Sequence, residues 1–133
     1  MIEKRNIWTI LDGVIETEQL VNGYIFYGID YIILQQAAYY FVEQFFNKKA
    51  PFSLTADTLK NTPDLYVFSA ETNSIKIEDI RHIQERVKYG PSQQNQLFVI
   101  IEHADQLTVQ AANAFLKTLE EPLDRITFIL LTT

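Results

Sequence analysis

The sequence predicts an α/β domain of three layers, in which a parallel sheet lies between two layers of helices. Residues 97–101 (LFVII) are five consecutive apolar residues, rich in β-branched types, and they predict a central strand buried on both faces. Glu102 follows at the carboxyl end of that strand, and Thr108 can cap a helix that we expect to reach about Glu120 and to stop at Pro122. A buried strand, an acid and a capped helix in this order are typical of the second half of a nucleotide-binding site.

The first half of the chain predicts a helix, a strand and a second helix. A strand at residues 24–27 ends at Gly28, and the apolar stretch 32–46 predicts the helix that follows it. The first helix is amphipathic and should end near Asn22-Gly23. It is predicted from apolar residues at helical spacing, which are Ile7, Leu11, Val14 and Ile15. We expect the aromatic residues of the second helix to pack in the core, and these are Tyr39, Tyr40, Phe41, Phe45 and Phe46.

The second half supplies the remaining strands and one more helix. Residues 65–68 predict a second strand, and residues 126–133 predict a closing strand. Between them, Gly90-Pro91 should close a helix at residues 76–88. One face of that helix carries Ile77, Ile80, Ile83 and Val87.

Five segments of this half carry a more specific pattern. They are NTPDLYVF (61–68), SIKIEDIRHIQERV (74–87), VIIEHADQLT (99–108), AANAFLKTLEEP (111–122) and ITFILLTT (126–133). In these segments the chain resembles the AAA+ ATPase domain of bacterial DNA polymerase III clamp loaders, and most of all the delta-prime subunit and its gamma/tau relatives. The first sixty residues or so match only in outline. The resemblance implies a P-loop NTPase fold of the AAA+ type.

The segment at the position of the P-loop lacks the residues that bind phosphate. A working P-loop reads G-x-x-x-x-G-K-[ST], whose backbone amides, lysine and hydroxyl hold the phosphates and magnesium. After the strand at 24–27 the chain reads GIDYIILQ, so that Gly28 is retained, while Ile33, Leu34 and Gln35 replace the second glycine, the lysine and the hydroxyl residue. Desolvating a triphosphate without a cation costs several kcal/mol, so we expect no tight binding of ATP and no cofactor.

The second half of the site also lacks the residues of an active ATPase. Glu102 stands where the resemblance places a magnesium-binding Asp, and His103 stands where an active ATPase has the Glu that activates water. A histidine carries no fixed negative charge and is the weaker base, so hydrolysis is not expected. We therefore predict no catalytic residue and no metal site. The other interpretation of Glu102 and His103 is that they are polar residues that end a strand.

Composition agrees with one small domain. The chain has 133 residues, of which 47% are hydrophobic, and a single core can be built from them. It has no cysteine, which excludes the four-cysteine zinc module that many members of the resembled family carry in the place of residues 47–61. No apolar run of eighteen residues and no cleavable signal pattern is present, so we expect a cytoplasmic protein.

Basic residues on or beside the helix at 77–87 raise the question of DNA contact. They are Lys76, Arg81, Arg86 and Lys88, and the nearby acids Glu78, Asp79 and Glu85 offset most of their charge. The net charge of −6 also opposes independent binding of nucleic acid. A solvated face of mixed charge is the simpler interpretation, and we expect contact with primed DNA only within an assembled complex.

The sequence therefore predicts a non-catalytic, delta-prime-like subunit that helps a clamp loader to place the sliding clamp on primed DNA. Its expected partners are the gamma/tau-type ATPase subunits and the delta subunit, with the sliding clamp only indirectly involved. The expected interface lies at the end of the helix at 108–120, beside the degenerate site, and comprises Lys117, Glu120, Glu121 and Pro122. Residues 1–133 are expected to be one domain of a longer protein, without the lid and collar domains of the resembled family. The alternatives are a stand-alone interaction adaptor derived from this fold and a clamp-loader subunit that binds ATP weakly.

Overall fold

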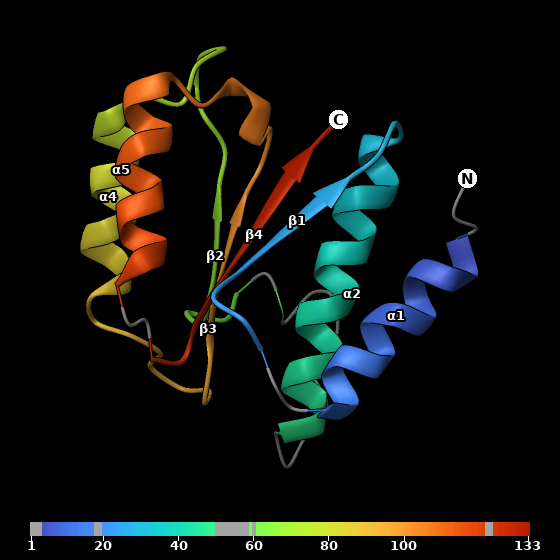
Figure 1. The fold of residues 1–133 in the computed structure, drawn as a ribbon. Coiled ribbons are helices and arrows are strands. Elements are labelled where there is room, and N and C mark those ends of the chain that lie inside the picture. The colour runs from blue at the N-terminus through green and yellow to red at the C-terminus, as the bar shows by residue number, and fades with distance from the viewer. Residues whose placement is uncertain (1–3, 18–19, 50–58, 60, 122–123) are drawn as a thin grey trace.

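A parallel sheet between two pairs of helices forms the domain (Figure 1). The computed structural model describes residues 4–17, 20–49, 59, 61–121 and 124–133. One face of the sheet is covered by α1 (Lys4–Thr17) and α2 (Tyr31–Lys49), and the other face by α4 (Ile77–Val87) and α5 (Val109–Glu120). The predicted three-layer α/β fold is confirmed.

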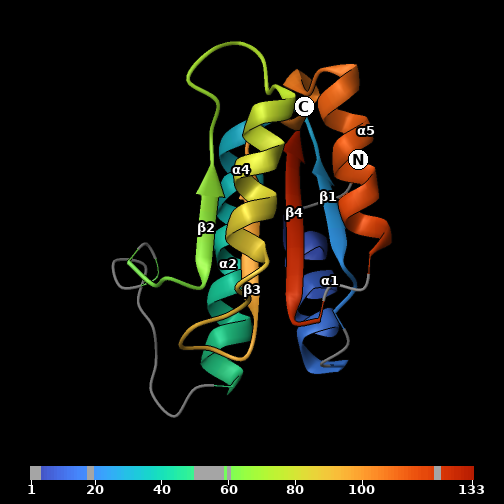
Figure 2. The same cartoon turned by 90° about the vertical axis from the view of Figure 1, so that its left-hand side faces the viewer.

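The sheet has four parallel strands in the order β1-β4-β3-β2. The strands are β1 (Gly23–Tyr27), β2 (Leu65–Phe68), β3 (Leu97–Ile101) and β4 (Ile126–Thr132). Because all four run the same way, their carboxyl ends meet at one edge of the sheet, as the arrowheads in Figure 2 show. The strands β1 and β2 lie at the two sides of this sheet.

The prediction of a central strand at 97–101 is confirmed, because every residue of β3 is buried. Phe98 lies at the middle of the core on the α2 side, where its ring meets those of Phe41, Phe45 and Phe46 edge to face at centroid distances of 6.0, 5.4 and 5.3 Å. These three aromatic residues of α2 are buried, as expected, while Tyr39 and Tyr40 are partly buried against the same core. A second cluster fills the space between the sheet and α4 and α5.

The first helix ends earlier than predicted. It stops at Thr17, and Gly23 is already the first residue of β1. A Cβ atom on Gly23 would lie 3.3 Å from Leu119 Cδ2 of α5, so the strand and the helix approach closely there and a larger residue would require the leucine to shift by a few tenths of an ångström. The Asn22-Gly23 pair therefore marks a close approach at the start of a strand, and the prediction that it ends a helix is wrong.

The later boundaries agree with the sequence within three residues. The N-cap at Thr108 is confirmed, because its Oγ1 accepts a hydrogen bond of 3.1 Å from the backbone N–H of Ala111. Helix α2 begins one residue before the predicted start at Ile32 and continues three residues beyond Phe46. Pro122 lies outside the described residues. Among the helices that the structure describes, none has the length and apolar character needed to span a membrane.

Candidate functional site

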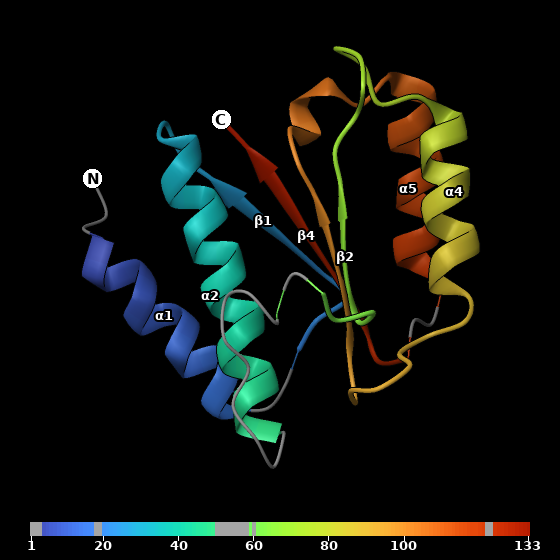
Figure 3. The ribbon, with the colours of Figure 1, turned by 180° about the vertical axis from the view of Figure 1, so that it is seen from behind.

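The topology brings the two halves of the predicted site to one edge. Gly28 follows β1 and Glu102 follows β3, and β4 lies between these two strands. The backbone N–H of Gly28 donates to the carbonyl oxygen of Thr132 at the end of β4, at 3.3 Å. The residues predicted from the two motifs therefore belong to one site, which is seen from behind in Figure 3 where α2 meets the tips of the strands.

The phosphate cradle is replaced by the first turn of a helix. Only three residues separate β1 from α2, which starts at Tyr31, so that Ile33 is helical. The carboxylate of Asp30 accepts hydrogen bonds from the backbone N–H groups of Ile32 (3.1 Å) and Ile33 (3.4 Å). In a P-loop, free amides at this position face the phosphates. Here a fixed negative charge already occupies them.

The residue in the lysine position faces the core. Leu34 is 6% exposed and belongs to the apolar cluster between α2 and the sheet. A Cβ atom on Gly28 would lie 3.4 Å from Leu34 Cδ2, so Leu34 packs directly beside the retained glycine. No part of Leu34 can compensate phosphate charge.

The residues in the two magnesium positions are joined to each other. Nε2 of Gln35 donates to Oε2 of Glu102 at 2.6 Å, and the hydroxyl of Ser69, which follows β2, donates to Oε1 of the same carboxylate. In an NTPase the equivalent hydroxyl and acid share a magnesium ion. The amide of Gln35 provides the donor in place of the cation, and it ties α2 to the end of β3.

Tyr31 completes this network. Its ring stacks on the imidazole of His103 with a centroid distance of 4.1 Å and an interplanar angle of 7°, and its hydroxyl oxygen accepts from the backbone N–H of His103 at 3.2 Å. Burial and, next in size, the negative charge of Glu102 raise the pKa of Tyr31 to about 12. The exposed side chain of His103 is therefore held against Tyr31.

Together, these side chains contact one another at the positions where a P-loop NTPase holds a nucleoside triphosphate and magnesium. We define the network as Tyr31, Gln35, Ser69, Glu102 and His103, with Asp30 beside it at the helix start. Within the ranges that the structure describes, no group of three or more His, Asp or Glu residues could hold a metal ion. The contributions of Asp30, Tyr31 and Ser69 were not predicted from the sequence. An acid before an apolar helix is a readable capping signal for Asp30, whereas the roles of the other two depend on tertiary contacts.

The proposed interface residues lie at the opposite edge. Lys117, Glu120 and Glu121 are exposed, as an interface requires. However, α5 begins near the carboxyl end of β3 and runs against the strands, so its last turn lies at the edge where the strands begin (Figure 1). The expectation that this helix end lies beside the degenerate site is therefore wrong, while its role as an interface stays a prediction.

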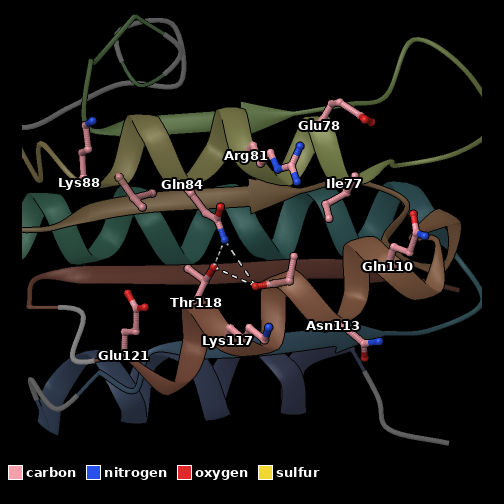
Figure 4. A pocket seen from close by; sticks show the side chains of 12 residues that line it. Ile77, Glu78, Arg81, Gln84, Lys88, Gln110, Asn113, Lys117, Thr118 and Glu121 are labelled. Atoms are coloured by element: carbon pink, nitrogen blue, oxygen red, sulfur yellow. Dashed lines mark hydrogen bonds between the residues drawn. The ribbon is translucent and has the colours of Figure 1, made fainter.

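An open groove of about 960 Å³ separates the outer sides of α4 and α5 (Figure 4). Its floor contains a hydrogen bond of 2.7 Å from Gln84 Nε2 to Thr118 Oγ1, and charged residues of both signs line it, including Glu78, Arg81 and Lys117.

Two of the basic residues considered for DNA contact bind other groups of the domain. Arg86 donates to the carbonyl oxygens of Pro63 (2.6 Å) and Gly90 (3.3 Å), and Lys88 pairs with Glu85 at 2.6 Å. These contacts favour the interpretation as a mixed-charge face.

The fold defines a class of protein: a P-loop-type α/β domain, in which only three residues separate β1 from the helix that follows it. The sequence pattern of the family described as "DNA polymerase III, delta subunit" matches residues 3–133, and the chain belongs to this clamp-loader family. This confirms the resemblance that the sequence motifs indicated.

Individual relatives agree with the family. The chain is 39% identical over 72 residues to the DNA polymerase III subunit delta' of Bacillus subtilis. The aligned segment covers 54% of this chain and 22% of that protein. It is 40% identical over 70 residues to the DNA polymerase III subunit tau of the same organism, and this aligned segment covers 53% of this chain and 12% of tau. A solved structure of a DNA polymerase III gamma subunit-related protein from Thermotoga maritima superposes with a TM-score of 0.73 at 28% identity, over 95% of this chain and 38% of that one. The matched segments thus span less than half of the length of each of these relatives.

Proposed function

We propose that this domain is a non-catalytic, delta-prime-like subunit of a DNA polymerase III clamp loader, acting in the cytoplasm as one domain of a longer protein. The observation that carries the proposal is the hydrogen bond between Gln35 and Glu102, because the two side chains that would share magnesium in an ATPase bind each other. A subunit of this kind contributes a fixed surface against which ATP-hydrolysing subunits of the gamma/tau type can close.

The contacts within the site support this positional role. Glu102 receives donors from α2 and from the residue after β2, and the Tyr31–His103 stack adds a further contact between α2 and the end of β3. These contacts are made between residues of three separate elements. In an ATPase, the same joint would form and dissolve with nucleotide binding. In this domain the contacts are made by its own side chains, which suits a subunit that holds its neighbours in place.

The surface used for assembly can be tested at the end of α5. Lys117→Glu combined with Glu121→Lys keeps the net charge and changes only exposed residues, so it should alter the free energy of unfolding by no more than about 0.5 kcal/mol. We expect the full-length variant to co-purify less well with gamma/tau-type ATPase subunits, and to retain its circular dichroism spectrum.

A matched control is the exchange of Glu85 and Lys88, which keeps an exposed ion pair on α4 while reversing its direction. This control should assemble like the wild type. If the α5 variant also assembles normally and supports clamp loading at the wild-type rate, the end of α5 is not the interface.

A further inference from the structure

The pair Asn22-Gly23 lies where the chain enters β1, and it combines a reactive side chain with a reactive backbone group. Among the asparagines of the chain, Asn22 is the one that a glycine follows. The backbone nitrogen after an asparagine can attack the carbonyl carbon of the side chain and close a five-membered imide ring. A glycine in that position leaves the nitrogen open to this approach, because no Cβ atom lies beside it.

The side chain of Asn22 is available for this reaction. It is exposed, and within the described part of the chain its amide makes no hydrogen bond. The described structure therefore contains no contact that holds the amide away from the backbone nitrogen of Gly23.

The backbone nitrogen of Gly23 takes no part in the pairing of β1 with β4. The carbonyl oxygen of Asn22 accepts from the N–H of Phe128 at 2.8 Å, and the N–H of Gly28 donates to Thr132, so the even-numbered residues direct their polar groups toward β4. Gly23 directs its N–H to the opposite side. The bond to Phe128 lies at the first position of the strand, where local opening costs least.

A second acid or amide residue before a glycine shows how the fold suppresses the same chemistry. Asp12-Gly13 lies inside α1, where the backbone N–H groups donate to the preceding turn of the helix. The carboxylate of Asp12 also accepts a hydrogen bond from the hydroxyl of Tyr40 at 2.6 Å. We therefore expect the reaction at Asn22 and not at Asp12.

We propose that Asn22 is a site of spontaneous covalent modification, at which the side-chain amide is lost through a cyclic imide. The backbone nitrogen of Gly23 bonds to Cγ of Asn22 and loses its proton, and the amide nitrogen takes up a proton and leaves as ammonia. Water then opens the ring at either carbonyl carbon. Attack at Cγ gives aspartate, and attack at the backbone carbonyl gives isoaspartate. In total one water is consumed and one ammonia is released.

The two products differ in their effect on the sheet. Both add one negative charge to the net charge of −6. Isoaspartate also leads the backbone through an additional methylene group, which displaces the carbonyl group that accepts from Phe128. It displaces Gly23 as well, which packs closely against Leu119. Isoaspartate should therefore loosen the start of β1, whereas aspartate should not. The proposal does not depend on the nucleotide site or on the clamp-loader role.

Incubation of the full-length protein at mildly alkaline pH, followed by peptide mass spectrometry, tests the proposal. We expect a gain of one mass unit in the peptide that contains Asn22, at a rate within about tenfold of that in the free peptide LVNGY (20–24). Asn22→Gln should show no gain at this position, because its longer side chain would have to close a six-membered ring. Modification that is slower in the folded protein than in the free peptide by about 100-fold or more would overturn the proposal.

An internal control is provided by Asn73, which is also exposed but precedes a serine. Its modification should be slower than that of Asn22 by about tenfold or more, because the Cβ atom of Ser74 hinders the backbone nitrogen. Equal rates at the two asparagines would contradict the role assigned to Gly23.

The melting temperature tests the difference between the two products. A sample enriched in isoaspartate should melt about 4 °C or more below the unmodified protein, whereas Asn22→Asp, which has the charge without the additional methylene group, should melt within about 1 °C of it. An endoproteinase that cleaves before aspartate leaves isoaspartate uncut and so measures the two fractions. An isoaspartate sample that melts with the unmodified protein would contradict the expected loosening of β1.

Discussion

Restoring the P-loop residues should destabilise this protein and should not create an ATPase. The triple variant Ile33→Gly, Leu34→Lys, Gln35→Thr is expected to lower the free energy of unfolding by about 3–6 kcal/mol. Most of the loss comes from Leu34, because a lysine would replace a side chain that is 6% exposed within the apolar core. Glycine at position 33 weakens the first turns of α2, and threonine at position 35 removes the amide that donates to Glu102.

Chemical denaturation measures this loss, and release of phosphate measures turnover. Gln36→Lys is a suitable control, since Gln36 is exposed on the same helix and the change should stay within about 0.5 kcal/mol. No turnover is expected, because His103 provides no carboxylate to activate water. A triple variant as stable as the wild type that releases phosphate steadily would show that the second half of the site has been wrongly assigned.

A second large effect is expected far from the site, at Asp64. This side chain is fully buried, and its carboxylate accepts hydrogen bonds from the backbone N–H groups of Ser92 (2.6 Å), Gln93 (2.7 Å) and Gln94. It thereby fixes the loop that leads into β3. Asp64→Ala should lower the free energy of unfolding by about 2–4 kcal/mol, because three amides lose a charged acceptor.

Urea denaturation of Asp64→Ala beside Asp124→Asn provides the comparison. Asp124 is 93% exposed and is 3.8 Å from the guanidinium of Arg125, so its substitution should change the free energy of unfolding by less than about 1 kcal/mol. Equal stability of the two variants would mean that the 92–94 loop does not depend on the buried carboxylate.

The elements that could be predicted from the sequence are those with a strong local signal. The apolar run of β3 and the threonine cap of α5 are encoded in neighbouring residues, and the structure has both where the sequence placed them. The Asn22-Gly23 pair was misread, because a glycine that ends a helix and a glycine that permits close packing look alike in sequence. Only the distance between Gly23 and Leu119, which are far apart in the chain, distinguishes the two.

The candidate site was likewise predictable only where the signal is local. Motif spacing was sufficient to place Gly28, Leu34, Gln35 and Glu102 in one site. It could not show that Gln35 and Glu102 bind each other, because that contact joins residues 67 positions apart and depends on the order of the strands. The position of the last turn of α5 could not be predicted from neighbouring residues either, because it depends on the direction of the helix, which runs antiparallel to the strands.

Binding of ATP is the most direct test of the central claim that side chains of the domain occupy the nucleotide site. The measurement is the melting temperature of the full-length protein, titrated with ATP and magnesium up to millimolar concentration. A ligand present at 100 times its dissociation constant would add about 2.7 kcal/mol to the free energy of unfolding, which is readily seen as a shift. We predict no saturable shift, with Glu102→Ala as a control for effects of magnesium alone. A clear, saturable increase in the melting temperature of the wild type that Glu102→Ala abolishes would contradict the account.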